Sequence, residues 1–201
     1  MQIKKEEVKE RILQAAEAEF LELGYEKASI RRIIKSAKTT IGNFYNYFEG
    51  KEAVFTELIE EVYNMFIYVI ENHHKWNCDN SLWESQDVNV WRVGLLQLIK
   101  PMMPKLDNRF LLLMDCSKGT KYETAKDKLI DVLTKHFIEH IEEFSLDYPH
   151  ADIGPILSKQ LISGMVESLR STDNIDKRSE LLIEQVLFFA IGTMGILSGR
   201  L

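Results

Sequence analysis

Apolar residues recur three and four positions apart along nearly all of the 201 residues, and no segment alternates steadily between apolar and polar. This spacing is typical of amphipathic α-helices. The pattern therefore predicts an all-α protein of about nine helices. Pro101 and Pro104 should end or kink the fifth of these, and polar turns are expected at 77–87, 147–149 and 171–174. The helices are expected at residues 6–23, 29–36, 39–47, 50–74, 88–103, 108–116, 120–144, 152–170 and 177–197.

The first three helices are short enough to share one small core. Gly24 should end the first helix in a left-handed conformation, which glycine adopts at no steric cost. Ser29 is a residue type that favours the start of a helix and is expected to cap the second. The predicted core consists of Phe20, Ile33, Ile41, Phe44 and Phe48.

The third helix is rich in small polar and aromatic side chains and has almost no charge. Thr40, Asn43, Tyr45 and Asn46 lie on it, and Glu49 is the single acidic residue between positions 27 and 51. A helix in the DNA major groove needs side chains that reach base edges and phosphates, and carboxylates there would repel the backbone. The second and third helices are therefore predicted to form a helix-turn-helix that reads DNA.

The charge distribution agrees with one DNA-binding face on an acidic body. The whole chain has a formal net charge of -6, but six Lys and Arg residues between positions 27 and 51 face only Glu49, a local charge of +5. A basic patch of this kind attracts phosphates. Taken alone, a basic patch is more often just a solvated surface, so the reading depends on the ordered pattern of residues around it.

Residues 12–55 resemble the DNA-binding region of the TetR/AcrR family of transcriptional regulators. The resemblance implies a homodimer that binds a palindromic, double-stranded DNA operator and represses transcription until a small-molecule effector enters the larger domain. We expect a helix-turn-helix domain at residues 1–50 and an effector-binding and dimerisation domain at 51–201, because the boundary falls at the start of the fourth helix and not at a flexible linker. The matching residues are Ala15-Ala16, Phe20, Gly24-Tyr25, Ser29-Ile30, Ile33, Ala37, Gly42, Phe44-Tyr45, Tyr47-Phe48 and Lys51-Glu52.

The turn between the second and third predicted helices departs from the family pattern. The family commonly has Ala-Gly-Val-Ser where this chain has Ala37-Lys38-Thr39-Thr40. Lys38 in the left-handed conformation should cost roughly 1 kcal/mol, and its ammonium would lie close to a phosphate. Thr39 replaces an apolar residue and should loosen that corner.

Roles in DNA binding can be assigned to individual side chains. Asn43 can pair with an adenine edge and Ile41 can meet a thymine methyl group, whereas Tyr45 and Asn46 suit phosphates. Lys51 looks like the family's phosphate-contacting lysine. The residues expected to contact DNA are Arg31, Lys38, Thr39, Thr40, Ile41, Asn43, Tyr45, Asn46 and Lys51.

The last predicted helix is apolar on nearly all sides between positions 186 and 197. Such a helix is not stable on the surface of a monomer. With the preceding helix it is expected to form a four-helix dimer interface across a two-fold axis, although a buried core helix in a monomer is the plainer alternative. The residues expected there are Ile156, Gln160, Leu161, Phe188, Phe189, Gly192 and Leu197.

An effector pocket is expected among the central helices, where aromatic residues and methionines cluster. His136 and His140 could be polar anchors in it or plain core residues. His136-x-x-Glu139-His140 also matches a zinc-peptidase pattern, which makes a zinc metallohydrolase the alternative function. No third ligand stands in a suitable motif, so no cofactor or metal is expected. The expected pocket residues are Phe66, Trp91, Leu95, Phe110, Met114, His136, His140 and Met165.

The remaining features favour a cytoplasmic protein without a membrane span. Cys78 and Cys116 are far apart and are interpreted as free thiols in a reducing compartment. The charged N-terminus has no signal-peptide core. The uncharged run at 186–197 is shorter than the roughly 20 residues that a membrane helix needs.

Overall fold

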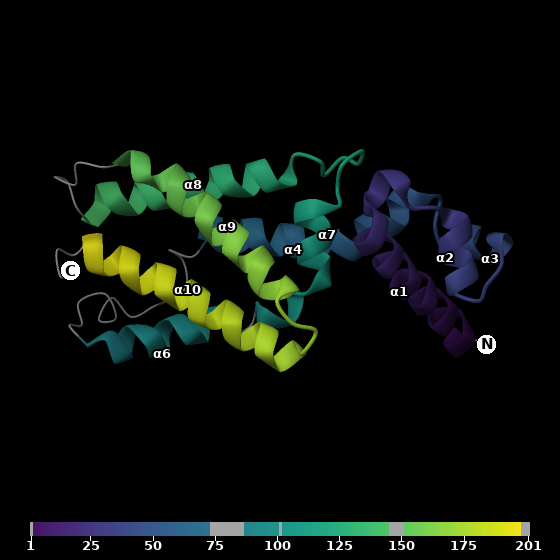
Figure 1. The fold of residues 1–201 in the computed structure, drawn as a ribbon, viewed down its shortest axis with the longest axis horizontal. Helices are drawn as coiled ribbons and strands as arrows, with labels where there is room; N and C mark the ends of the chain where they lie inside the picture. Colours follow the sequence, from purple (N-terminus) through teal and green to yellow (C-terminus); the bar gives the residue numbers. More distant parts are fainter. Residues whose placement is uncertain (1, 73–86, 101, 145–150, 198–201) are drawn as a thin grey trace. The chain divides into compact units, whose positions relative to one another are not determined.

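The computed structural model describes residues 2–72, 87–100, 102–144 and 151–197. Nine α-helices and two 3-10 helices occur in these ranges, with no strand among them, so the all-α prediction is confirmed (Figure 1). None of these helices combines the length and the apolar character that crossing a bilayer requires. The elements are α1 (Gln2–Lys27), α2 (Ile30–Ser36), α3 (Ile41–Tyr45), α4 (Lys51–Asn72), α6 (Val88–Ile99), η2 (Met103–Lys105), α7 (Asn108–Asp115), α8 (Ala125–Phe144), η3 (Ala151–Ile153), α9 (Gly154–Arg170) and α10 (Ile175–Leu197).

The chain divides into two compact units. The N-terminal unit consists of residues 1–64 and 107–126, and the C-terminal unit consists of residues 65–106 and 127–201. Helix α4 has residues in both. These units are defined by packing within the chain, whereas the boundary expected between positions 50 and 51 separates a DNA-binding from an effector-binding domain. That functional boundary therefore stays a prediction.

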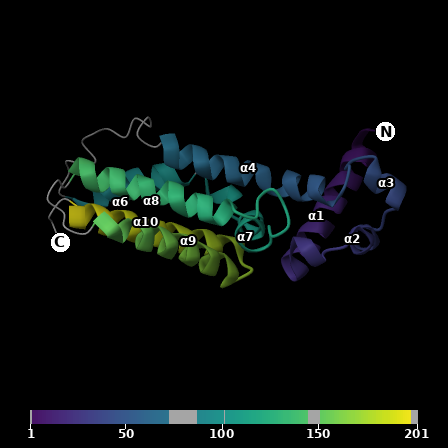
Figure 2. The same cartoon turned by 90° about the horizontal axis from the view of Figure 1, so that it is seen from above.

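Helix α1 contains a kink at Gly24. Its φ of 73° and ψ of 164° interrupt the helical geometry, and one further turn follows through Lys27. The expected positive φ at Gly24 is confirmed, but the glycine does not end the element. The extra turn, with its carbonyl groups, forms the junction between α1 and α2 (Figure 2).

An aromatic and aliphatic core holds the N-terminal unit together. The rings of Phe20 and Phe55 meet edge to face with centroids 5.1 Å apart, and Phe44 and Phe48 are 5.8 Å apart. Four of the five predicted core residues are buried, whereas Ile41 is 46 % exposed. The prediction of Ile41 as core was wrong, because Phe44 takes the inward face of α3.

The segment 107–126 completes the N-terminal unit, which the sequence pattern did not predict. Helix α7 packs against α1, and Asn108 donates a hydrogen bond of 2.8 Å to Glu17. The backbone N–H of Tyr25 donates to the carbonyl oxygen of Cys116 over 3.0 Å. These contacts attach the middle of the chain to the helix that carries the helix-turn-helix.

In the C-terminal unit, α9 and α10 pack side by side and run in opposite directions (Figure 1). Gln185 joins them, because its amide donates to the carbonyl oxygen of Leu161 over 3.1 Å and accepts from Ser168 over 3.0 Å. The same amide covers Gly164, where an added Cβ would lie 2.1 Å from Nε2. A side chain at this position would displace the flexible end of Gln185 and disturb its two hydrogen bonds.

Some helix ends differ from the predictions. Helix α6 ends at Ile99, ahead of Pro101, which agrees with the expected break. Helix α8 begins at Ala125 and not at Thr120, because the Thr120 hydroxyl bonds to Ser117 and Tyr122 in a turn. Helix α3 ends at Tyr45, two residues early. The predicted loop at 77–87, apart from Asp87, the turn at 147–149 and Cys78 lie outside the described residues.

Candidate nucleic-acid interface

Helix α3 has one buried side and one exposed side. Phe44 is fully buried, whereas Tyr45 is 55 % exposed and Asn43 and Asn46 are also exposed. Because successive helical residues are about 100° apart, one inward phenylalanine turns its neighbours outward. The outward side chains are uncharged hydrogen-bonding groups and an aromatic ring, a set that suits base edges and phosphates.

Two threonines fix the start of α3. Thr40 is the N-cap, and its hydroxyl oxygen accepts the backbone N–H of Asn43 over 3.2 Å. The side-chain amide of Asn43 donates to the hydroxyl of Thr39 over 3.3 Å. Thr39 was expected to loosen this corner, but it instead orients the residue that was assigned to an adenine edge.

Lys38 occupies the turn between α2 and α3 with a φ of 49°. The left-handed conformation anticipated for this residue is therefore present. For a residue with a Cβ it costs roughly 1–2 kcal/mol. The side chain is exposed, so the strain is not offset by burial of its stem.

Replacing Lys38 by glycine is expected to stabilise the protein and at the same time to weaken its binding to DNA. Glycine relieves the strain, and part of this gain is lost to its greater freedom in the unfolded chain, so the free energy of unfolding should rise by up to about 1 kcal/mol. Binding to a DNA duplex should weaken, and the slope of log K against log salt should fall by about one if a phosphate contact is lost. Chemical denaturation and a salt titration measure the two effects.

Lys38→Ala is the matched control, because alanine removes the ammonium and keeps the strain. It should weaken DNA binding as Lys38→Gly does without the gain in stability. Two variants that bind DNA as tightly as the original chain would show that Lys38 makes no phosphate contact.

The basic patch is smaller than the sequence suggested. Arg31, Lys35 and Lys38 are exposed. Arg32, however, donates to Glu19 over 2.9 Å and to Glu22 over 3.2 Å, and the hydrogen bond to Glu19 raises its pKa. The count over residues 27–51 missed these carboxylates because both precede that segment.

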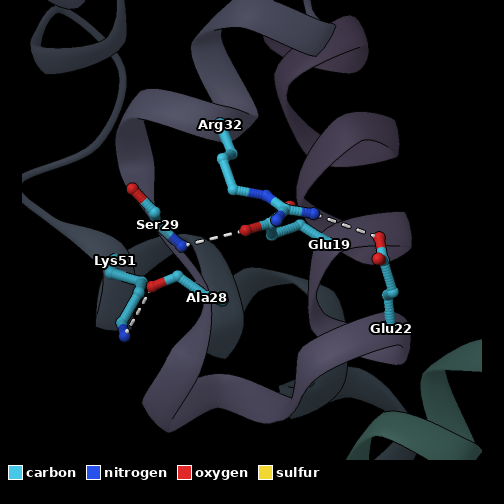
Figure 3. A network of polar contacts seen from close by, with 6 residues as sticks. All are labelled: Glu19, Glu22, Ala28, Ser29, Arg32 and Lys51. Carbon is cyan, nitrogen blue, oxygen red and sulfur yellow. Dashed lines mark hydrogen bonds and ion pairs between the residues drawn. The ribbon is translucent and has the colours of Figure 1, made fainter.

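Lys51 lies at the start of α4, and Figure 3 shows its ammonium beside the carbonyl oxygen of Ala28. Its Nζ is 2.6 Å from the oxygen of Tyr25, 3.3 Å from that of Glu26 and 3.1 Å from that of Ala28. Partial burial lowers the pKa of Lys51, and the nearby Glu26 carboxylate opposes that shift. An ammonium has three N–H donors, so none is left here for a phosphate.

Glu19 is a functional residue that the sequence analysis missed. It is only 7 % exposed, and its carboxylate accepts the backbone N–H of Ser29 over 3.1 Å. Ser29 is the N-cap residue of α2, as expected, but its own side chain makes no capping hydrogen bond, and the carboxylate of Glu19 binds its N–H instead. The available signal was the position of Glu19 on the same helix face as Ile12, Ala16 and Phe20, where a carboxylate needs a partner.

The expected pocket residues belong to different compact units. Phe110 and Met114 are buried in the N-terminal unit, whereas Phe66 and Met165 are buried in the C-terminal unit. His136 is partly buried on α8, and the side chains of Trp91, Leu95 and His140 lie outside the description. The pocket stays a prediction.

The zinc-hydrolase alternative gains no support. Among the side chains that the structure describes, no group of three or more His, Cys, Asp or Glu residues could hold a metal ion. Cys116 is buried and is not part of a disulfide among the residues that the structure describes.

The residues expected at a dimer interface are partly exposed in the single chain. Phe188 is 77 % exposed and Ile156 is 57 % exposed, and Gln160 is also exposed. Phe189 and Gly192 are half-buried, and Leu161 is largely buried within its own chain. Because α9 and α10 are antiparallel, the start of α9 and the end of α10 lie at the same end of the pair. The side chain of Leu197 is not described.

Two short helices joined by a tight turn, with an uncharged polar face on the second, define a helix-turn-helix DNA-binding protein. Residues 12–58 match the model of the family described as bacterial regulatory proteins, tetR family. This N-terminal segment is therefore similar to the DNA-binding segment of that family, which agrees with the resemblance noted from the residues.

Two curated relatives from Bacillus subtilis match the same part of the chain. The uncharacterised helix-turn-helix-type transcriptional regulator YdgC is 41 % identical over 64 residues, which cover 32 % of this chain and 33 % of YdgC. The corresponding regulator YvdT is 35 % identical over 81 residues, covering 40 % of this chain and 41 % of YvdT. The matched region thus spans about a third to two fifths of the length of these relatives.

Solved structures resemble the chain over most of its length. A regulator of the TetR/AcrR group from Aquifex aeolicus is 22 % identical with a TM-score of 0.47, covering 89 % of this chain and 97 % of the other. A protein described as a TetR-family regulator from Syntrophomonas wolfei is 18 % identical with a TM-score of 0.48, covering 93 % and 96 %. The match to the family model is confined to the N-terminal segment.

Proposed function

We propose that the protein is a ligand-responsive repressor that binds a palindromic operator as a homodimer. The observation that carries this proposal is the division of α3, where Phe44 is buried while Ile41, Asn43, Tyr45 and Asn46 are exposed. A recognition helix needs this division, because its inner side must hold it to the domain while its outer side reads bases. Arg31 on α2 and Lys38 in the turn before α3 are exposed and positively charged.

A homodimer is proposed because one short recognition helix reads few bases. Two such helices spaced about one DNA turn apart, roughly 34–36 Å, would read two half-sites. The exposed Phe188 and Ile156 supply apolar surface for a two-fold contact between α9 and α10 pairs. Since the operator lies on the chromosome, the proposed location is cytoplasmic.

Release by a small-molecule effector is the proposed regulation. Helix α4 begins at Lys51 in the N-terminal unit and continues to Asn72 in the C-terminal unit, so one helix can transmit a displacement. The effector must bind the DNA-free conformation more tightly than the DNA-bound one, and a coupling of about 1–3 kcal/mol is sufficient.

The direct test is footprinting of the purified full-length protein on the DNA upstream of its own coding region. A protected palindrome, with binding that weakens steeply as salt increases, is the expected result. A chain that protects no segment there, and selects no sequence from a random duplex pool, would contradict the proposal.

Asn43→Ala should then weaken binding to the protected site by about 1–3 kcal/mol and relax the preference for one base pair, because a bidentate adenine contact is lost. Fluorescence anisotropy on the operator and on single-base variants measures both effects. Asn72→Ala is the control, because it replaces the same residue type at the far end of α4. It should leave the operator affinity and the base-pair preference unchanged. Equal losses on all the duplexes would show that Asn43 contacts the backbone and not a base.

A further inference from the structure

The peptide group between Ala28 and Ser29 is held at both ends by charged side chains. Its carbonyl oxygen accepts from the ammonium of Lys51 over 3.1 Å, and its N–H donates to the carboxylate of Glu19 over 3.1 Å (Figure 3). Hydrogen bonds to charged groups are roughly twice as strong as neutral ones. A cation and an anion therefore fix the plane of the peptide that leads directly into α2.

The same ammonium holds the turn that precedes this peptide. Lys51 also donates to the carbonyl oxygens of Tyr25 and Glu26, which lie in the turn after the kink at Gly24. Carbonyl groups at a helix end lack donors from a following turn and carry partial negative charge, so a cation stabilises them. The Tyr25 ring lies under the ammonium, with its centroid 4.2 Å from Nζ.

The carboxylate of Glu19 extends the arrangement into α2. It accepts from the guanidinium of Arg32 over 2.9 Å as well as from the N–H of Ser29. Arg32 lies within α2, so the start and the middle of this helix are both fastened to α1. Helix α2 in turn leads to α3 through the short turn at Lys38, whose φ is 49°.

We propose that Lys51 is a positioning residue for DNA reading: together with Glu19 it clamps the Ala28–Ser29 peptide and so sets the orientation of α2 and α3. In this role Lys51 contributes to DNA affinity through the geometry of the recognition helix and not through a phosphate. The inference rests on the proposed DNA binding and differs from the phosphate contact that the family resemblance implied.

Two substitutions in the full-length chain separate the roles. Lys51→Arg keeps a positive charge that can reach a phosphate, but its planar guanidinium does not fit three converging carbonyl groups. Lys51→Met keeps the length of the stem and removes both charge and donors. Lys38→Ala is the comparator for a direct phosphate contact. Operator affinity is measured over a salt series, and hydrogen exchange of residues 25–36 is measured without DNA.

Both Lys51 variants are expected to bind the footprinted duplex roughly tenfold more weakly, with an unchanged salt slope. Exchange across residues 25–36 should accelerate in both variants before any DNA is added. Lys38→Ala should instead reduce the salt slope by about one and leave the exchange unchanged. Should Lys51→Met fail to fold, Lys51→Arg alone carries the comparison.

Wild-type affinity in Lys51→Arg, with a smaller salt slope in Lys51→Met and unaltered exchange, would overturn the inference in favour of a phosphate contact. A wild-type chain that binds no duplex would defeat the proposed function instead. In that case the exchange measurement would still decide whether Lys51 fixes the junction between α1 and α2.

Discussion

Phe44→Ala is expected to lower the free energy of unfolding of the N-terminal unit by about 3–5 kcal/mol. The side chain is fully buried and its ring packs 5.8 Å from that of Phe48, so truncation leaves a cavity in a small core. Helix α3 has only five residues, too few to be stable without tertiary packing, and Phe44 is its one buried side chain. DNA binding should be lost together with the helix. Chemical denaturation followed by circular dichroism, with hydrogen exchange of residues 37–50, measures the loss.

Tyr45→Ala is the matched control, since the next residue on the same helix is 55 % exposed. It should change stability by less than about 1 kcal/mol, the part due to its edge contact with Phe44. DNA affinity should still fall, because the exposed ring is assigned to a phosphate. Equal destabilisation by the two substitutions would mean that α3 does not have the two-sided arrangement described above.

Phe188→Lys is expected to convert the protein into a monomer and to weaken operator binding by roughly a hundredfold or more. The aromatic side chain is 77 % exposed on α10, and a dimer contact would bury it. A lysine there would place two unpaired charges beside the two-fold axis, and burial of such charges is costly. Analytical ultracentrifugation gives the oligomeric state, and anisotropy on full and half operators gives the affinity.

Ile175→Lys offers a control of equal exposure. Ile175 is also 77 % exposed on α10, but it is the first residue of the helix, far along the axis from Phe188. This variant should remain a dimer with unchanged affinity for the operator. A dimeric Phe188→Lys protein would show that another surface forms the interface, and a monomeric wild type would refute the homodimer itself.

The elements of the fold were predictable because helical periodicity is a local property. The spacing of Phe44 and Phe48 indicates which side of their segment is buried, and Thr40 marks where the helix begins. The positive φ at Lys38 was expected from the family resemblance, because the family commonly has glycine at this position. These features depend on neighbours within about one helical turn.

The partners of the charged residues were not predictable in the same way. Lys51 binds carbonyl groups 23 to 26 positions earlier, and Arg32 binds a carboxylate 13 positions earlier. A basic side chain near a recognition helix has the same appearance in the sequence whether it binds a phosphate or a helix end. The membership of residues 107–126 in the N-terminal unit depends likewise on packing between distant segments.

That membership has a consequence for how such proteins can be recombined. Helix α7 and the turns after it contribute the Asn108–Glu17 and Cys116–Tyr25 hydrogen bonds to the unit that carries α3. Residues 1–50 are therefore not a unit that can be transferred without the rest of the chain. A chimera spliced at position 50 would lack α7 and would expose to solvent the side of α1 against which α7 packs. If the proposed effector domain were exchanged during evolution, a surface shaped like α7 would have to accompany it, so operator choice and the ancestry of that domain should remain linked.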